Sequence, residues 1–377
     1  MKILHFSPLL KSAGLSRLAA DLACALQERG TQNLVLAPPC ELVSRMQECG
    51  IQHARCNKPN ILTAIRGKSK LKSLIREFEP DILQVYSREA AWIAGITCRK
   101  LKKKPPIVGV MTGYPLAGFA NVGLNYCNCF TTVSKHLRSV LGEHSELFRK
   151  QKQPWVIPYG VNQHLCFPNY KPSQNWSEQW ERAHPGKKEA FTLCIPGALS
   201  PVHGLDDLVP ILQQLLKNGV PAHAFIAGDV RLSTPGYVEH LRNLFSQAQI
   251  ENRITWIGAR IDMRDVMSTC NVTLSLAHEP STHDHTILEA LALGRPVAGY
   301  DHGSVGELLS SFLPEGRIPP SDPAAMADVL TQWYTYPPVT PCDIPYPYRI
   351  TDTAHSYTEL YQYILQQTVQ FDERRPS

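Results

Sequence analysis

The chain has 377 residues, 43% of them hydrophobic, and carries a formal net charge of +5. This length favours two domains, each with an ordinary hydrophobic core. The longest apolar runs, such as residues 90–97, are far shorter than the roughly 20 residues that a membrane-spanning helix needs, which excludes an integral membrane protein. The opening residues 1–10 predict a buried strand and no signal peptide, since one early lysine precedes only a short apolar run. We therefore expect a cytoplasmic protein.

Strand and helix patterns alternate along the first half. Residues 2–7 form the first strand pattern, and a helix is expected from about residue 14 to residue 29, with leucines at helical spacing on one face. Further strand-like runs lie at residues 33–39, 81–87, 106–114, 129–134 and 155–161. This alternation is typical of a doubly wound parallel sheet of an α/β domain.

A polar, proline-bearing stretch interrupts the pattern at residues 168–190, where we expect a linker. A second series of strands then follows at residues 191–199, 222–230, 253–259, 272–277 and 295–301, and helices are expected at residues 205–219, 236–248, 262–269, 286–294 and 353–368. The predicted organisation is two Rossmann-like domains, residues 1–167 and 191–345, facing a central cleft, with a helical tail at residues 346–377 that packs back on the first domain. Ligands of such sheets bind at the carboxyl ends of the strands.

Charge is unevenly distributed between the two halves. Residues 1–165 hold 23 lysines and arginines against 10 acidic residues, whereas the remainder holds 15 against 23. Two basic clusters, Arg66–Arg76 and Arg99–Pro106, suit an anionic membrane surface, although each also fits a solvated helix face. Without interleaved aromatics or a recognisable motif, they do not favour nucleic acid.

The eleven cysteines are irregularly spaced and predict reduced, mostly buried thiols. Cys127 and Cys129 form a C-x-C pair, but no second pair lies at zinc spacing. Histidines at positions 278, 283, 285 and 302 invite a second metal hypothesis, yet they lie in an expected loop without defined ligand spacing. We therefore expect no metal site.

A helix expected to begin near Thr286 has a start suited to anions. Its first N–H groups lack intrahelical partners and carry a partial positive charge. The simpler interpretation is an N-capped amphipathic helix that ends at Gly294, with Pro296 starting the next strand.

Six segments, in order, make the chain resemble the retaining glycosyltransferases of family 4, which have the GT-B fold. SAGLSRLAADLACALQERG resembles the family's glycine loop and first helix, and FTTVSKHLRSVL the last strand and helix of its first domain. VIPYGVNQHLCF is similar to the signature before the interdomain link. IPGALSPVHGLDDL, FIAGDV and ILEALALGRPVAGYDHGSVGELL resemble successive segments of the donor-binding domain.

The resemblance implies a nucleotide-sugar donor, a UDP-, GDP- or ADP-sugar, with its diphosphate at the helix start and its ribose on Glu289. Ser281 and Thr282 would cap the helix or donate hydrogen bonds, and the loop at Gly303 would supply further N–H groups. The catalytic residues would be Glu289, His203 and Thr112. The donor-binding residues would be Gly14, Gly197, Ala198, His203, Gly258, Ser281, Thr282, His283, Asp284, His285, Thr286, Glu289, Gly303 and Glu307.

Several family positions are substituted in this chain. The first of the family's two glutamates falls on Ser281, and the arginine and lysine that neutralise the diphosphate fall on Ala198 and His203. The family's histidine falls near Thr112, and the paired glycines of its first loop are reduced to Ala13-Gly14. Fixed cations at a leaving diphosphate contribute on the order of 3 kcal/mol each. We expect histidines 203, 283, 285 and 302 to compensate in part, in their charged forms.

Three functions remain open from the sequence. The first is a transferase that moves a sugar onto a saccharide or glycolipid acceptor such as a lipopolysaccharide, resting peripherally on the cytoplasmic face of a membrane. The second is a degenerate transferase fold that serves as a protein-binding subunit. A dinucleotide-dependent oxidoreductase is disfavoured because no G-x-G-x-x-G follows the first strand.

Overall fold

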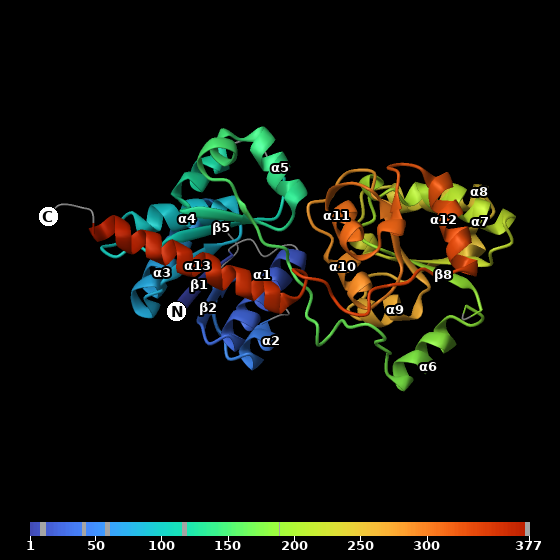
Figure 1. The fold of residues 1–377 in the computed structure, drawn as a ribbon, viewed down its shortest axis with the longest axis horizontal. Coiled ribbons are helices and arrows are strands. Elements are labelled where there is room, and N and C mark those ends of the chain that lie inside the picture. Colours follow the sequence, from blue (N-terminus) through green and yellow to red (C-terminus); the bar gives the residue numbers. More distant parts are fainter. Residues whose placement is uncertain (8–12, 40–42, 57–60, 115–118, 188, 374–377) are drawn as a thin grey trace. The chain divides into compact units, whose positions relative to one another are not determined.

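The computed structural model describes residues 1–7, 13–39, 43–56, 61–114, 119–187 and 189–373. Two compact units make up the chain (Figure 1). The first unit comprises Met1–Asn162 together with Tyr346–Ser377, and the second comprises Gln163–Pro345. The expected linker at residues 168–190 therefore lies inside the second unit, and the tail belongs to the first.

A parallel sheet of seven strands forms the centre of the first unit, in the order β3-β2-β1-β4-β5-β6-β7. Its strands are β1 (Lys2–Phe6), β2 (Gln32–Ala37), β3 (Gln52–Arg55), β4 (Ile82–Val85), β5 (Ile107–Met111), β6 (Cys129–Thr132) and β7 (Trp155–Val156). The helices are α1 (Ala13–Glu28), α2 (Val43–Glu48), α3 (Ile61–Phe78), α4 (Arg88–Cys98), α5 (Lys135–His144) and α13 (Ile350–Glu373), with the 3-10 helix η1 (Phe119–Tyr126) and the π-helix η2 (Leu147–Gln151).

The second unit repeats this plan with a parallel sheet of six strands in the order β10-β9-β8-β11-β12-β13. Its strands are β8 (Phe191–Pro196), β9 (Ala222–Ala227), β10 (Ile254–Trp256), β11 (Val272–Ser275), β12 (Val297–Tyr300) and β13 (Arg317–Ile318). The α-helices are α6 (Gln174–Ala183), α7 (Leu208–Lys217), α8 (Tyr237–Gln247), α9 (Met263–Thr269), α10 (His285–Ala292), α11 (Gly303–Phe312) and α12 (Pro323–Thr335). The expected class, two Rossmann-like α/β domains, is confirmed.

Central strands are apolar because helices cover both faces of each sheet. All six residues of β9 are buried, as are the four residues of β4 and the five of β5. Strand positions that the sequence predicted are confirmed, whereas β3 and β13 were not expected. Among the described residues, no helix is both long enough and apolar enough to span a membrane.

The tail is joined to the first unit by close backbone contact. Figure 1 shows α13 beside α1, and buried residues of α13 such as Tyr357 belong to the core of this unit. Thr353 Oγ1 donates to the carbonyl oxygen of Pro158 at 2.8 Å and accepts from the N–H of Gly160 at 2.9 Å. A Cβ atom on Gly160 would lie 2.2 Å from the carbonyl oxygen of Arg349. Only glycine permits this approach.

Candidate functional site

The strand order of the second unit locates a natural ligand site. From β8 the chain builds outward to β9 and β10 on one side and to β11, β12 and β13 on the other. Ligands of open parallel sheets bind where the order reverses, at the carboxyl ends of the strands. The candidate site therefore lies at the ends of β8 and β11, where the loops 197–204 and 276–284 emerge.

These two loops are in direct backbone contact. The N–H of His278 donates to the carbonyl oxygen of Val202 at 2.9 Å. Gly204 has φ +66°, and a Cβ atom there would lie 1.9 Å from the carbonyl oxygen of Leu276. A larger residue would push the loops apart, so Gly204 sets the width of the site.

A third loop, which follows β12, is held against the second. The N–H of Ser304 donates to the carbonyl oxygen of Ser281 at 2.9 Å. Gly303 has φ +58°, and a Cβ atom there would lie 2.6 Å from that same oxygen. Residues 303–305 were expected in a loop but form the first turn of α11. The site thus borders the N-termini of two helices, α10 and α11.

The start of α10 differs from the expected cap. Asp284 is the N-cap residue, and no side chain caps the helix through a hydrogen bond. The Asp284 carboxylate instead accepts hydrogen bonds from Ser304 Oγ at 2.6 Å and from Ser281 Oγ. The Ser281 hydroxyl therefore donates to Asp284 and does not cap the helix amides. The helix start presents amides suited to an anion, but a carboxylate stands beside them.

Glu289 lies one turn inside α10 and is 5% exposed. Its Oε1 is 3.5 Å from Nε2 of His285, the residue one turn earlier. Isolated buried carboxylates are costly, so this neighbour helps to hold the side chain in place.

Burial weakens the expected compensation by histidine. It lowers the pKa of His203 below its ordinary value, and the nearby Asp284 carboxylate only partly opposes this. Burial also lowers the pKa of His283 to about 4. Both shifts oppose the expected cationic imidazoles in the free protein. His203 Nδ1 forms a hydrogen bond of 2.7 Å with Ser200 Oγ.

A second polar network, which the sequence did not reveal, connects the first two loops to the end of β12. Asp207 Oδ2 lies 2.9 Å from His278 Nε2 and accepts a hydrogen bond from the Tyr300 hydroxyl. Asp207 follows the first loop, His278 belongs to the second, and Tyr300 ends β12. The sequence signal for this network is the Asp206-Asp207 pair after Gly204. The two partners of Asp207 lie 71 and 93 residues away along the chain, so the local sequence does not indicate them.

Most of the expected donor residues gather in these loops and helices. Gly197, Ala198 and His203 follow β8, residues 281–284 follow β11, and Glu307 lies in the second turn of α11. Gly258 instead follows β10, the edge strand, two strands away from β8. Gly14, in the first turn of α1, and the half-buried Thr112, after β5, belong to the first unit.

The described residues contain no group of three or more His, Cys, Asp or Glu side chains placed to hold a metal ion. Among the described residues, histidines 278, 283, 285 and 302 therefore do not form a metal-ligand set with a carboxylate.

Two family models match the chain, one in each unit. Residues 12–165 match the model described as Glycosyltransferase Family 4, and residues 177–340 match Glycosyl transferases group 1. Together the models extend over most of the chain, in the order of the GT-B architecture. This chain is a glycosyltransferase of GT-B type.

Solved structures similar to this glycosyltransferase share its whole length. A glycosyltransferase from Rickettsia africae aligns with a TM-score of 0.79 at 18% identity, over 97% of this chain and 98% of that one. Anabaena Alr3699/HepE in complex with UDP-glucose aligns at 0.71 and 18% over all of both chains. The lipopolysaccharide outer core galactosyltransferase WaaB aligns at 0.64 and 14% over 99% and 100%. At these identities the likeness establishes the fold alone. No curated protein sequence is significantly similar to the chain.

Proposed function

We propose that this glycosyltransferase moves a sugar from a nucleotide-sugar to a saccharide or glycolipid acceptor. The observation that carries the proposal is the start of α10, whose amides lack a side-chain cap while the buried Glu289 lies one turn inside the helix. This pairing suits a donor whose diphosphate meets the amides and whose ribose hydroxyls donate to the carboxylate. The similar Anabaena protein was solved with UDP-glucose, which favours a UDP-sugar over a GDP- or ADP-sugar.

We further propose a retaining, front-face transfer without a metal. The bond between the sugar C1 and the diphosphate oxygen breaks, and the acceptor oxygen bonds to C1 on the same face. The acceptor proton passes to the departing diphosphate, so charge and atoms balance. Glu289 would hold the donor, and His203 would donate a hydrogen bond to the diphosphate. Thr112 of the first unit stays a candidate catalytic residue.

Catalytic degeneration is the second candidate, and a specific observation favours it. Ala198 provides no charge, burial lowers the pKa of His203, and the Asp284 carboxylate lies at the site. In that case the fold would bind a partner protein and would turn over no donor.

Calorimetry and thermal shift with UDP, GDP and ADP test the proposal. A ligand at 100 times its Kd stabilises its binder by about 2.7 kcal/mol, so one base should raise the unfolding temperature. Slow hydrolysis of the matching sugar nucleotide should follow. Glu289→Gln should weaken binding roughly 10- to 100-fold through lost charge-assisted hydrogen bonds. Glu239→Gln, on the exposed face of α8, should change neither nucleotide binding nor hydrolysis of the sugar nucleotide. The absence of nucleotide binding and of hydrolysis would favour the degenerate alternative.

Peripheral contact with an anionic membrane on the cytoplasmic side is also part of the proposal. It would bring a lipid-linked acceptor to the enzyme, and it rests on the basic excess of residues 1–165.

A further inference from the structure

We propose that a defined surface of the first unit, the α4 surface, docks on anionic membrane lipids. It consists of the outer side of α4, the loop that joins α4 to β5, and the adjacent η1; its exposed members are Trp92, Arg99, Lys100, Lys102, Lys103, Lys104 and Val122. The inference gives the proposed membrane association a location, and it is independent of nucleotide binding.

Charge is concentrated in the loop. All five of its cations, at positions 99, 100 and 102–104, are exposed, and none forms an ion pair with another described residue. The backbone between them is fixed: the N–H of Leu101 donates to the carbonyl oxygen of Cys98 at 3.0 Å, and Leu101, Pro105 and Pro106 are buried. Fixed like charges repel one another, and an anionic surface relieves that repulsion.

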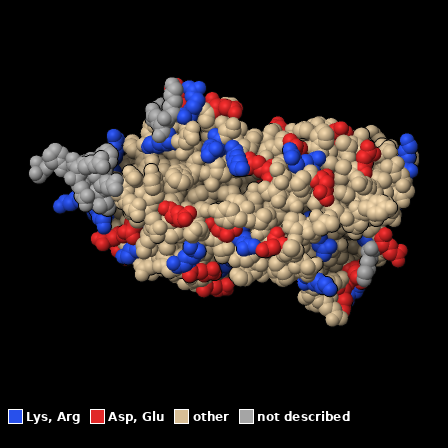
Figure 2. Space-filling view, in the orientation of Figure 1, with Lys and Arg blue, Asp and Glu red and all other residues tan. Residues whose placement is uncertain are grey.

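On one face of the first unit, charges of both signs are mixed. On the face shown in Figure 2, lysine and arginine side chains are interspersed with carboxylates over the first unit. Glu89, in the first turn, is the only carboxylate of α4, at the end opposite the loop. Glu79 lines a cavity together with Arg76, Lys100, Lys102 and Lys103, where the cations outnumber it four to one. The loop therefore presents a net positive charge to an anionic membrane.

Apolar side chains continue the surface along α4. Trp92 is 43% exposed and Val122 is 47% exposed. Helical spacing places Trp92, Ile96 and Arg99 on one side of α4. A Cβ atom on Gly123 would lie 2.6 Å from Cβ of Trp92, so η1 packs tightly on α4 at the tryptophan, and Val122 is the residue of η1 next to Gly123. Tryptophan flanked by long cations is typical of membrane-water interfaces.

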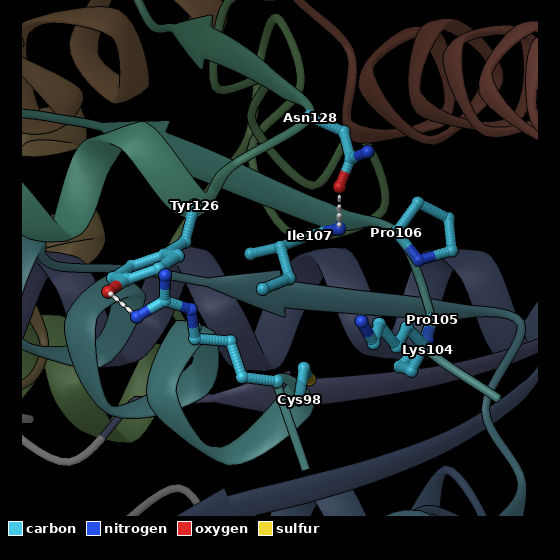
Figure 3. A pocket seen from close by; sticks show the side chains of 9 residues that line it. Cys98, Lys104, Pro105, Pro106, Ile107, Tyr126 and Asn128 are labelled. Atoms are coloured by element: carbon cyan, nitrogen blue, oxygen red, sulfur yellow. Dashed lines mark hydrogen bonds between the residues drawn. The ribbon is translucent and has the colours of Figure 1, made fainter. Parts of the chain in front are cut away.

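A cavity of about 200 Å³ opens in this surface, and Figure 3 shows Tyr126, Lys104 and Asn128 around it. Arg99 also lines it and donates from Nη1 to the Tyr126 hydroxyl at 3.3 Å. Asn128 Oδ1 accepts from the N–H of Ile107 at 2.8 Å, which leaves the Asn128 amide NH₂ as a donor for a ligand. No carboxylate lines the cavity. Two cations and a neutral donor suit the phosphate of a lipid headgroup.

The orientation of the surface is compatible with catalysis. Helix α4 runs beside the parallel sheet from the carboxyl end of β4, and its following loop enters β5 at the amino end. Docking would thus cover a flank of the sheet and leave the carboxyl ends of its strands, where ligands of such sheets bind, uncovered.

Sedimentation with vesicles tests this assignment on the full chain. The wild type should bind vesicles of equimolar phosphatidylcholine and phosphatidylglycerol, should ignore pure phosphatidylcholine, and should detach at high salt. Because each lysine near an anionic surface contributes about 1 kcal/mol, the combined Lys102→Gln, Lys103→Gln and Lys104→Gln variant should bind roughly 100-fold more weakly. Trp92→Ser should weaken binding to the same anionic vesicles at low salt, because it removes the apolar part of the surface.

A matched control distinguishes location from total charge. Lys68→Gln, Lys70→Gln and Lys72→Gln together remove the same charge from α3, and this variant should retain most of the binding. The assignment would be overturned by any of three results: equal losses of vesicle binding in both triple variants, unchanged binding in the loop variant, or no binding of the wild type to anionic vesicles. Inorganic phosphate that displaces the protein from vesicles at matched ionic strength would also overturn it, because the ligand would then be free phosphate. Nucleotide binding in solution should be equal in all variants. A lack of nucleotide binding would therefore count against the proposed function and not against the membrane surface.

Discussion

Ser304 donates a hydrogen bond to Asp284, with 2.6 Å between Oγ and Oδ2, and thereby joins the first turn of α11 to the residue that precedes α10. Both helix starts border the candidate donor site. The contact orders the site, yet it also fixes a negative charge where the proposed diphosphate would bind. Donor affinity should therefore be limited by Asp284.

Asp284→Asn tests this limit. The Asp284 side chain makes no capping hydrogen bond to α10, and the amide oxygen of asparagine still accepts from Ser304, so the fold should be retained. Removal of the charge should tighten binding of the matching nucleoside diphosphate by about 1 kcal/mol, roughly fivefold in Kd. Isothermal calorimetry measures the change. Ser304→Ala, which keeps the carboxylate, should give no gain, and weaker binding by Asp284→Asn would contradict the proposed position of the diphosphate.

His203 should make donor turnover dependent on pH. Its pKa is lowered by burial, so the cationic form becomes populated only as the pH falls into the acidic range. A cation stabilises the departing diphosphate, and hydrolysis of the sugar nucleotide should therefore rise as the pH falls through this range. Initial rates between pH 5 and 8 measure the profile.

The variant His203→Lys should remove that dependence. Lysine stays charged at pH 8, so hydrolysis there should increase on the order of 10-fold, with a flat profile. His203→Gln provides the neutral control and should also be flat, but slow. A wild-type rate that is constant or falls toward pH 5, in a protein that remains folded, would remove His203 from the reaction.

Much of the fold was predictable because periodicity reports burial. The central strands are mostly apolar on both faces, and a helix such as α7 presents one apolar stripe, so both give strong patterns. The edge strand β3 has no buried residue and β13 has two residues, so neither produced a pattern. Helix α6 has no buried residue either, and its polar sequence suggested a linker.

The site was predictable in its chain segments and less so in its contacts. The loops after β8 and β11 could be assigned from ordered motifs. The partners of Asp284 and Asp207 could not, because they depend on how three separate loops meet. Likewise, the lowered pKa of His203 follows from burial, which a loop sequence does not report.

Gly160 should be essential for the attachment of α13. A methyl group there would lie 2.2 Å from the carbonyl oxygen of Arg349 and 2.6 Å from the nitrogen of Ile350. Gly160→Ala should destabilise the first unit by about 3 kcal/mol, since backbone must move to relieve the overlap. Gly142→Ala, in α5, meets nothing within 4 Å and should stabilise by up to about 1 kcal/mol. Urea unfolding compares the two, and equal effects would contradict the close approach.

His5 should make the first unit sensitive to acid. It is fully buried in β1, with Nδ1 2.8 Å from the Tyr86 hydroxyl and Nε2 3.0 Å from Asn33 Oδ1. Burial lowers its pKa from 6.5 to about 4. As the pH falls, the unfolded chain therefore takes up a proton on His5 before the folded chain does. The stabilisation that neutral His5 gives to the folded state is complete above pH 6.5 and is lost as the pH falls through about 4.

The expected loss for His5 approaches about 1.4 kcal/mol per pH unit within that window, and about 3 kcal/mol in total. Urea unfolding of the wild type at intervals from pH 7 to 4 measures it. His5→Gln retains hydrogen-bonding groups but cannot titrate, so it should be less stable at pH 7 and should lose less stability on acidification. Parallel slopes for the two proteins would mean that other groups govern acid unfolding, because a residue that does not titrate can contribute no slope of its own.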